Sequence, residues 1–377
     1  MSTTPGPDAT MGHSYRAFVS YSRSDINIVR RLVGVLRGEG VAPMWDDDLL
    51  PGSGFSDQIQ SFIANSHVLV PVLTPASAER PWLHQEIGFA IALGKPVLPI
   101  ALGGGIPQGI IGGIQAVELR DDLADAATKL RGELFYALMA PLREHPVTYQ
   151  CTEDNLRRAK LLAHYAQTVL DIRHYGRVRQ MASLTTFALP DRGGTDPAWR
   201  RCFQGTPADL SLFDALRDER AALLAHAQKA GCRLIIDPVE RLESVYRKHG
   251  TNSVFARVAG LLSFLRSPAV CDVVVAVNDE ETRKTSLTLV GDWFSSEAVS
   301  SGEERILRES VFTRCASLVQ RQVDDFDHRM DDLLALRGWS TQDSREMAIA
   351  YLEAYLAAKA DPGTPAQFRR EQSPAKS

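Results

Sequence analysis

The chain of 377 residues lacks the cysteine pattern of a disulfide framework or a zinc site. Its five cysteines are odd in number, far apart and never spaced C-x-x-C; they are Cys151, Cys202, Cys232, Cys271 and Cys315. We therefore expect reduced thiols. Long hydrophobic runs are lacking too. The longest apolar stretch, residues 87–114, is broken by Lys95, three prolines and many glycines, which is incompatible with a membrane-spanning helix.

Neither sign of charge dominates the sequence. A net charge of −4 and a pI near 6.2 argue against a strongly basic nucleic-acid-binding protein. No basic segment followed by an apolar one, as in a signal peptide, opens the chain. We expect a cytoplasmic protein with no membrane or nucleic-acid partner. A length of 377 residues predicts two domains, and residues 1–12 and 361–377 have the composition of disordered tails.

Several nucleotide-binding and signalling motifs are also missing. No G-x-x-x-x-G-K-[ST] sequence is present, which excludes a P-loop. The glycine-rich residues 103–113 do not match the Rossmann fingerprint and follow the fourth predicted strand rather than the first. A phosphorylation receiver needs an aspartate at the tip of the central strand, whereas this strand ends in Thr74 and Pro75.

The N-terminal third alternates apolar runs with helical periodicity. The pattern predicts strands at 15–22, 41–45, 67–74, 96–102 and 115–119, and helices at 25–37, 56–66, 81–93 and 121–141. Such alternation indicates an α/β domain with a parallel sheet covered by helices on both faces. Ligands of these sheets bind beyond the carboxyl ends of the strands. Trp82 and Glu86, four residues apart at the start of the third helix, would share one helical face at that edge.

Three segments, in this order and spacing, resemble the TIR-domain family: AFVSYSRSD (17–25), WDDDLLPGSGF (45–55) and PWLHQEIGFA (81–90), followed by KPVLPI (95–100). The resemblance covers residues 13–142 and implies a flavodoxin-like five-stranded parallel sheet. It implies that Glu86 is the catalytic residue of NAD⁺ cleavage. Many relatives have a cysteine where Leu83 stands, but that cysteine is not the catalytic group. The second segment resembles the BB loop, which mediates self-association; its residues here are Leu49, Leu50, Pro51, Gly52, Ser53 and Gly54.

The chemistry of NAD⁺ cleavage agrees with these residue types. Breaking the bond between ribose and nicotinamide builds positive charge at the anomeric carbon, which one carboxylate, Glu86, stabilises or captures. Trp82 offers a flat surface for stacking. Ser22 and Arg23, at a helix N-terminus, suit phosphate, while Ser24 or Asp25 is expected to cap that helix.

The acidic run 46–48 offers further candidates for substrate binding. Asp46 or Asp48 suits a ribose hydroxyl or the fixing of the BB loop, whereas three consecutive carboxylates point in alternating directions and cannot all bind one metal ion. We therefore predict no metal and no cofactor, with NAD⁺ as substrate. Trp45 is a further candidate for substrate binding, although packing is its simpler interpretation.

A linker at 143–154 and a second α/β domain at 155–360, with long C-terminal helices, are predicted. Helices are expected at 155–180, 209–229, 252–266, 303–336 and 341–359, and strands at 183–189, 232–237, 271–278 and 285–292. The last two strands suggest an antiparallel hairpin. The stripe Phe312, Ala316, Val319, Val323, Phe326, Met330 and Leu333 indicates either a helix packed on its own domain or a self-association seam. Segments 277–284 and 290–305 suit polar strand ends lining a pocket.

Three functional hypotheses follow. The first is a TIR-domain NAD⁺ glycohydrolase (an NAD⁺ nucleosidase) that releases nicotinamide with linear or cyclic ADP-ribose. TIR self-association would activate it under control of a C-terminal sensor that binds a ligand or protein, in signalling or antiviral defence. The second is a non-enzymatic TIR adaptor. The third is an enzyme similar to nucleoside deoxyribosyltransferases, which would act on free nucleosides.

Overall fold

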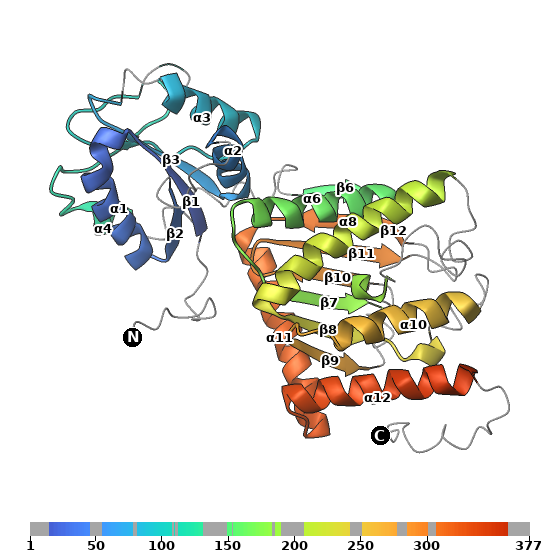
Figure 1. Ribbon diagram of the computed structural model, residues 1–377. Helices are drawn as coiled ribbons and strands as arrows, with labels where there is room; N and C mark the ends of the chain where they lie inside the picture. The colour runs from blue at the N-terminus through green and yellow to red at the C-terminus, as the bar shows by residue number, and fades with distance from the viewer. Residues whose placement is uncertain are drawn as a thin grey trace.

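The computed structural model describes residues 15–45, 55–77, 81–107, 109, 112–130, 149–152, 154–182, 185–189, 207–241, 251–276, 285–300 and 307–360. They form two α/β domains, each built on its own sheet (Figure 1). No helix within these ranges is both long and apolar enough to cross a membrane.

The N-terminal domain has a five-stranded, all-parallel sheet in the order β2-β1-β3-β4-β5. Its strands are β1 (Tyr15–Ser20), β2 (Val41–Met44), β3 (Val68–Leu73), β4 (Ile100–Ala101) and β5 (Val117–Glu118). Its helices are the 3₁₀ turn η1 (Arg23–Asp25), α1 (Ile26–Gly38), α2 (Phe55–Asn65), α3 (Pro81–Ala92) and α4 (Ala126–Lys129). The predicted parallel α/β fold is confirmed.

The fourth strand and the closing helix of this domain are much shorter than predicted. The fourth strand, expected at 96–102, is reduced to two residues and an isolated bridge between Leu69 and Val97. Pro96 and Pro99 have no N–H to donate, which limits the ladder there. The closing helix predicted at 121–141 is observed only as α4, and residues 131–141 lie outside the described ranges.

The alternation of side chains along β1 assigns its two faces. Ala17 and Val19 join the core beneath α1, whereas Phe18 packs with residues of α2 and α3. Because side chains two apart share a face, Ser20 lies with Phe18 on the side of α2 and α3. The last residue of β1 is therefore directed toward the helix that carries Glu86.

The C-terminal domain has a seven-stranded mixed sheet in the order β6-β12-β11-β10-β7-β8-β9. Its strands are β6 (Tyr149–Thr152), β7 (Val178–Ala182), β8 (Cys232–Ile236), β9 (Cys271–Val275), β10 (Thr285–Val290), β11 (Phe294–Ser300) and β12 (Leu307–Thr313). Strands β7, β8 and β9 are parallel to one another, and the remaining pairs are antiparallel.

Helices cover both faces of this sheet (Figure 1). One face packs against α6 (Asn155–Asp171), α8 (Pro207–Ala230), α10 (Thr251–Leu265) and α12 (Thr341–Ala360), with the short η6 (Thr186–Ala188). The other packs against α11 (Ala316–Arg337). Burial on both faces explains why β8 is a nearly continuous apolar run: Leu234 and Ile236 face one layer, and Ile235 faces the other.

Several predictions for this domain were wrong. The proposed linker contains β6, which pairs with β12 at the sheet edge. The helix predicted at 155–180 ends at Asp171 and is followed by β7, while 183–189 holds η6 rather than a strand. The predicted hairpin is absent, because β9 pairs with β8 and β10 lies between β11 and β7. The helix predicted at 303–336 begins at Ala316 and is preceded by β12.

Most of the apolar stripe of α11 packs within its own domain. Val319, Val323, Phe326 and Met330 are buried against side chains of β7, β8, β9 and β10. Phe312, the first residue of the stripe, belongs to β12 and to the opposite core. Ala316, the next residue of the stripe, packs with the core of the N-terminal domain. The packing interpretation is therefore confirmed for Val319, Val323, Phe326 and Met330, which are not available as a self-association seam. Of the two polar strand ends, 277–284 lies outside the described residues, and 290–305 contains β11.

The two domains meet at the base of β1. Arg16 is only 4% exposed, and its guanidinium carbon lies 4.1 Å from the ring centroid of Trp293, in the turn between β10 and β11. Its Nη1 lies 3.2 Å from Asp292 Oδ2, and its Nε donates to the Asn65 carbonyl at 3.2 Å. Helix α2 also contacts α6. The C-terminal domain therefore binds the end of β1 opposite to the carboxyl edge.

A group of basic side chains surrounds this contact. His67 Nδ1 accepts from the Arg16 backbone N–H at 2.9 Å, so the ring proton is on Nε2, 3.1 Å from the Arg314 carbonyl oxygen. Lys95 Nζ donates to the Ser66 carbonyl at 2.7 Å. Burial, followed by the charges of Arg16 and Lys95, lowers the pKa of His67 well below its usual value. His67 is therefore neutral at the domain boundary.

Candidate active site

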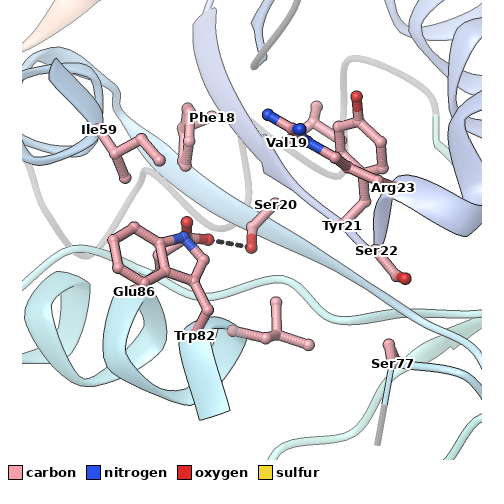
Figure 2. A pocket seen from close by; sticks show the side chains of 11 residues that line it. Phe18, Val19, Ser20, Tyr21, Ser22, Arg23, Ile59, Ser77, Trp82 and Glu86 are labelled. Carbon is pink, nitrogen blue, oxygen red and sulfur yellow. Dashed lines mark hydrogen bonds between the residues drawn. The ribbon is translucent and has the colours of Figure 1, made fainter. Parts of the chain in front are cut away.

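A cavity of about 430 Å³ opens at the carboxyl end of β1 (Figure 2). This volume lies in the range of small-molecule sites. Its walls come from β1 and the turn after it, from α2, from the loop after β3 and from α3. The lining residues are Phe18, Val19, Ser20, Tyr21, Ser22, Arg23, Ile59, Ser77, Trp82, Leu83 and Glu86.

Helix α3 brings Trp82 and Glu86 to this cavity. Pro81 is its first residue, where a missing N–H costs no hydrogen bond. Leu83 and Ile87 pack in the core and fix the orientation of α3. The helix face with Trp82 and Glu86 therefore lies at the carboxyl edge of the sheet. Trp82 is 39% exposed in the first turn, and Glu86, one turn later, is 7% exposed. The two residues that the sequence predicts as a pair therefore line one cavity. The Trp82 side chain is exposed to solvent, and the Glu86 side chain is buried.

The Glu86 carboxylate contacts β1. The Ser20 hydroxyl donates a hydrogen bond to Glu86 Oε2 (Figure 2). Phe18, Ile59 and Leu83 form the apolar part of the wall. A buried carboxylate is costly unless polar groups replace its water, and Ser20 supplies one such group. The arrangement places a carboxyl group in a partly apolar recess.

The turn after β1 forms the polar rim of the cavity. Ser22 is buried and Arg23 is exposed, and both line the cavity. Their contact with phosphate stays a prediction. The predicted capping of the first helix by Ser24 or Asp25 is confirmed in its position, Asp25, but not in its side-chain hydrogen bond. Asp25 is the N-cap residue of α1 but makes no capping bond; its Oδ2 accepts from Thr74 Oγ1 at 2.8 Å. Ser24 Oγ lies 2.6 Å from Ser22 Oγ.

Seven lining residues were not among the sequence-predicted candidates: Phe18, Val19, Ser20, Tyr21, Ile59, Ser77 and Leu83. The alternation along β1 carried a usable signal for Ser20, the last polar residue on the face toward α2 and α3. Ser77 carried none. Its Oγ accepts from the Thr74 N–H at 2.8 Å and donates to the Thr74 carbonyl at 2.9 Å, a turn that shapes the loop after β3.

The other candidates lie elsewhere. Trp45 is buried in the core, with its ring centroid 6.1 Å from that of Tyr21, and is not part of the cavity lining. Asp46, Asp48 and the predicted BB loop, Leu49, Leu50, Pro51, Gly52, Ser53 and Gly54, lie outside the described residues. Within the described ranges, no group of three or more His, Cys, Asp or Glu side chains is placed to bind a metal ion.

Comparison with known families decides the identity of the N-terminal domain. Residues 17–134 match the sequence profile of the TIR domain family. This region is a TIR domain. The match does not extend into the C-terminal domain. No curated protein matches the chain.

A matching solved structure is the TIR domain of the Toll-related receptor TRR-2 from Hydra magnipapillata. It is 18% identical over 35% of this chain and 100% of that chain, with a TM-score of 0.28.

Proposed function

We propose that the TIR domain cleaves NAD⁺ between nicotinamide and ribose. The observation that carries the proposal is the buried carboxylate of Glu86 in a cavity at the carboxyl edge of the sheet. In the reaction the bond between the anomeric carbon and the nicotinamide nitrogen breaks, and its electron pair leaves with neutral nicotinamide. Glu86 stabilises or captures the resulting cation. Water then adds its oxygen to the anomeric carbon and releases a proton, or an adenine nitrogen adds instead and gives a cyclic product.

The other lining residues have separate roles in this proposal. Trp82, exposed at the cavity wall, stacks on the flat nicotinamide ring or shapes its entry. Arg23 is exposed on the rim and binds phosphate by charge-assisted hydrogen bonds. Phe18, Ile59 and Leu83 make the recess partly apolar, which strengthens the electrostatic effect of Glu86 on developing charge.

The C-terminal domain is proposed to control this activity through TIR self-association. The contact that supports control is the binding of Arg16, at the base of β1, by Asp292 and Trp293. Ser20 and Arg16 lie on the same face of one six-residue strand. A signal that shifts this contact therefore reaches the strand that borders Glu86. The activating ligand or protein would bind the C-terminal domain, in a signalling or defence response.

TIR domains also serve as adaptors without enzymatic activity, so activity itself is the test. Purified full-length protein is incubated with NAD⁺ over a concentration series, and nicotinamide and ADP-ribose products are separated by chromatography. The proposal expects release whose specific rate rises with protein concentration. Activity on free nucleosides with none on NAD⁺ would instead support an enzyme similar to nucleoside deoxyribosyltransferases. No turnover of either, with TIR–TIR association intact, would support an adaptor.

A further inference from the structure

Ser20 lies where a strand end meets the carboxylate of the proposed active site. It is the last residue of β1, is 3% exposed, and borders the same cavity as Glu86. We propose that Ser20 is a positioning residue for Glu86, and that its hydroxyl bond fixes the place of the carboxylate relative to the anomeric carbon. The inference rests on the proposed function and adds a residue to it.

The two sides of this hydrogen bond differ in mobility. Glutamate has three side-chain torsions, and its carboxylate samples many positions unless something holds it. Serine has one torsion to its oxygen. Its backbone belongs to β1, which lies between β2 and β3 in the sheet and pairs with β3 as far as Ser20 itself. The rigid strand β1 therefore fixes the position of the flexible Glu86 side chain, which belongs to helix α3.

The hydrogen bond also sets the place of the carboxylate without changing its charge. Ser20 donates to Oε2, so the position of the Glu86 carboxylate is fixed from β1. A hydroxyl is neutral and donates without adding a positive charge, so Glu86 keeps the full negative charge that a cationic transition state requires. An arginine or lysine in its place would neutralise that charge. Ser20 lines the same cavity and reaches the carboxylate from a different element, strand β1.

Three substitutions separate positioning from packing. Ser20→Ala removes the donor, Ser20→Cys keeps the shape with a weak donor, and Ser20→Thr keeps a hydroxyl. Ser66→Ala is the matched control, because Ser66 is a buried serine of the same domain whose hydroxyl donates to the Ile63 carbonyl at 2.8 Å, away from the cavity. Full-length proteins are compared by steady-state nicotinamide release from NAD⁺, after thermal unfolding has shown that each is folded.

We expect kcat of Ser20→Ala to fall about 10- to 100-fold, as for the loss of one hydrogen bond to a charged group. Its KM should stay within about threefold, because a positioning bond acts on the transition state. Ser20→Cys should be intermediate, Ser20→Thr should regain most of the rate, and Ser66→Ala should match the wild type. An unchanged kcat for Ser20→Ala, or a rise in KM alone, would overturn the inference.

A second measurement decides the inference even if the wild type releases no nicotinamide, a result that would defeat the proposed function alone. Crystal structures of the wild type, Ser20→Ala and Ser20→Thr locate the Glu86 carboxylate directly. We expect it to leave its place, or to take several conformations, in Ser20→Ala and to keep its place in Ser20→Thr. One unchanged, well-ordered Glu86 conformation in Ser20→Ala would show that Ser20 does not position it.

Discussion

Replacing Arg16 by methionine tests how the two domains are held together. The guanidinium donates to the carbonyls of Asn65, Asp292 and Trp293 at 3.2 to 3.4 Å and lies over the Trp293 ring. Burial lowers the pKa of Arg16, and the nearby charge of Asp292 opposes this effect. The side chain thus bears a desolvation cost that its hydrogen bonds must offset. Methionine keeps much of the stem's volume but removes the donors and the charge.

The size of the effect follows from two contributions. Hydrogen bonds from a charged donor contribute about 1.5–3 kcal/mol, and a desolvated cation–π contact contributes about 2 kcal/mol. Removing the charge also removes its desolvation cost, which offsets part of this sum. The interface between the domains should therefore lose about 2 kcal/mol of stability in Arg16→Met. Asp292→Asn is the matched control. Because the Asp292 side chain is 48% exposed, loss of its ion pair should cost less than about 1 kcal/mol.

Hydrogen–deuterium exchange measures this loss at the interface itself. A loss of about 2 kcal/mol in local opening corresponds to roughly 30-fold faster exchange of the protected amides. We expect this acceleration in Arg16→Met at β1 and at the turn 291–293, and less than about fivefold in Asp292→Asn. Equal effects of the two variants would refute the reasoning, because the exposed ion pair would then contribute as much as the buried donors. No acceleration in Arg16→Met would refute it as well.

Two further predictions concern stability. His67 has a pKa well below the value of 6.5 that applies in an unfolded chain, so the unfolded state takes up the proton first as the pH falls. The free energy of unfolding should therefore decrease below about pH 6.5. Urea unfolding between pH 7.5 and 5 should show a shallower decrease in His67→Gln than in the wild type. Parallel pH dependences of the two proteins would contradict this prediction. Asp327 forms hydrogen bonds of 2.8 and 2.6 Å with the buried Arg179. Asp327→Ala should therefore lower the free energy of unfolding by about 3 kcal/mol. Asp331→Ala should lower it by less than about 1 kcal/mol, because the Asp331 side chain is 63% exposed. Equal losses for the two variants in urea unfolding would contradict the account.

Local hydrophobic periodicity was sufficient to predict the fold of the TIR domain. Its strands and helices alternate with the regularity of a parallel sheet, and the carboxyl edge follows from that order. The joint position of Trp82 and Glu86 at a cavity also followed, because a spacing of four in a helix fixes the relation between the two side chains. The hydrogen bond from Ser20 to Glu86 joins residues 66 positions apart and depends on how α3 packs against β1. No local pattern carries that information.

The C-terminal domain shows where periodicity misleads. Phe312 and Ala316 continue the apolar spacing of α11 toward the N-terminus, yet Phe312 lies in β12 and faces the opposite core. Short edge strands such as β6 carry too few residues to show a period. The contact of Arg16 with Trp293 joins residues 277 positions apart across two domains, so only the folded chain reveals it.

Nicotinamide release by Glu86→Gln tests the central claim most directly. Glutamine keeps the shape of the side chain and removes the negative charge. Glu118→Gln, at an exposed position of the same domain, is the matched control. The account predicts that wild type and Glu118→Gln release nicotinamide from NAD⁺ at equal rates that rise with protein concentration, and that Glu86→Gln loses at least about 100-fold in rate. Release that survives Glu86→Gln would contradict the account.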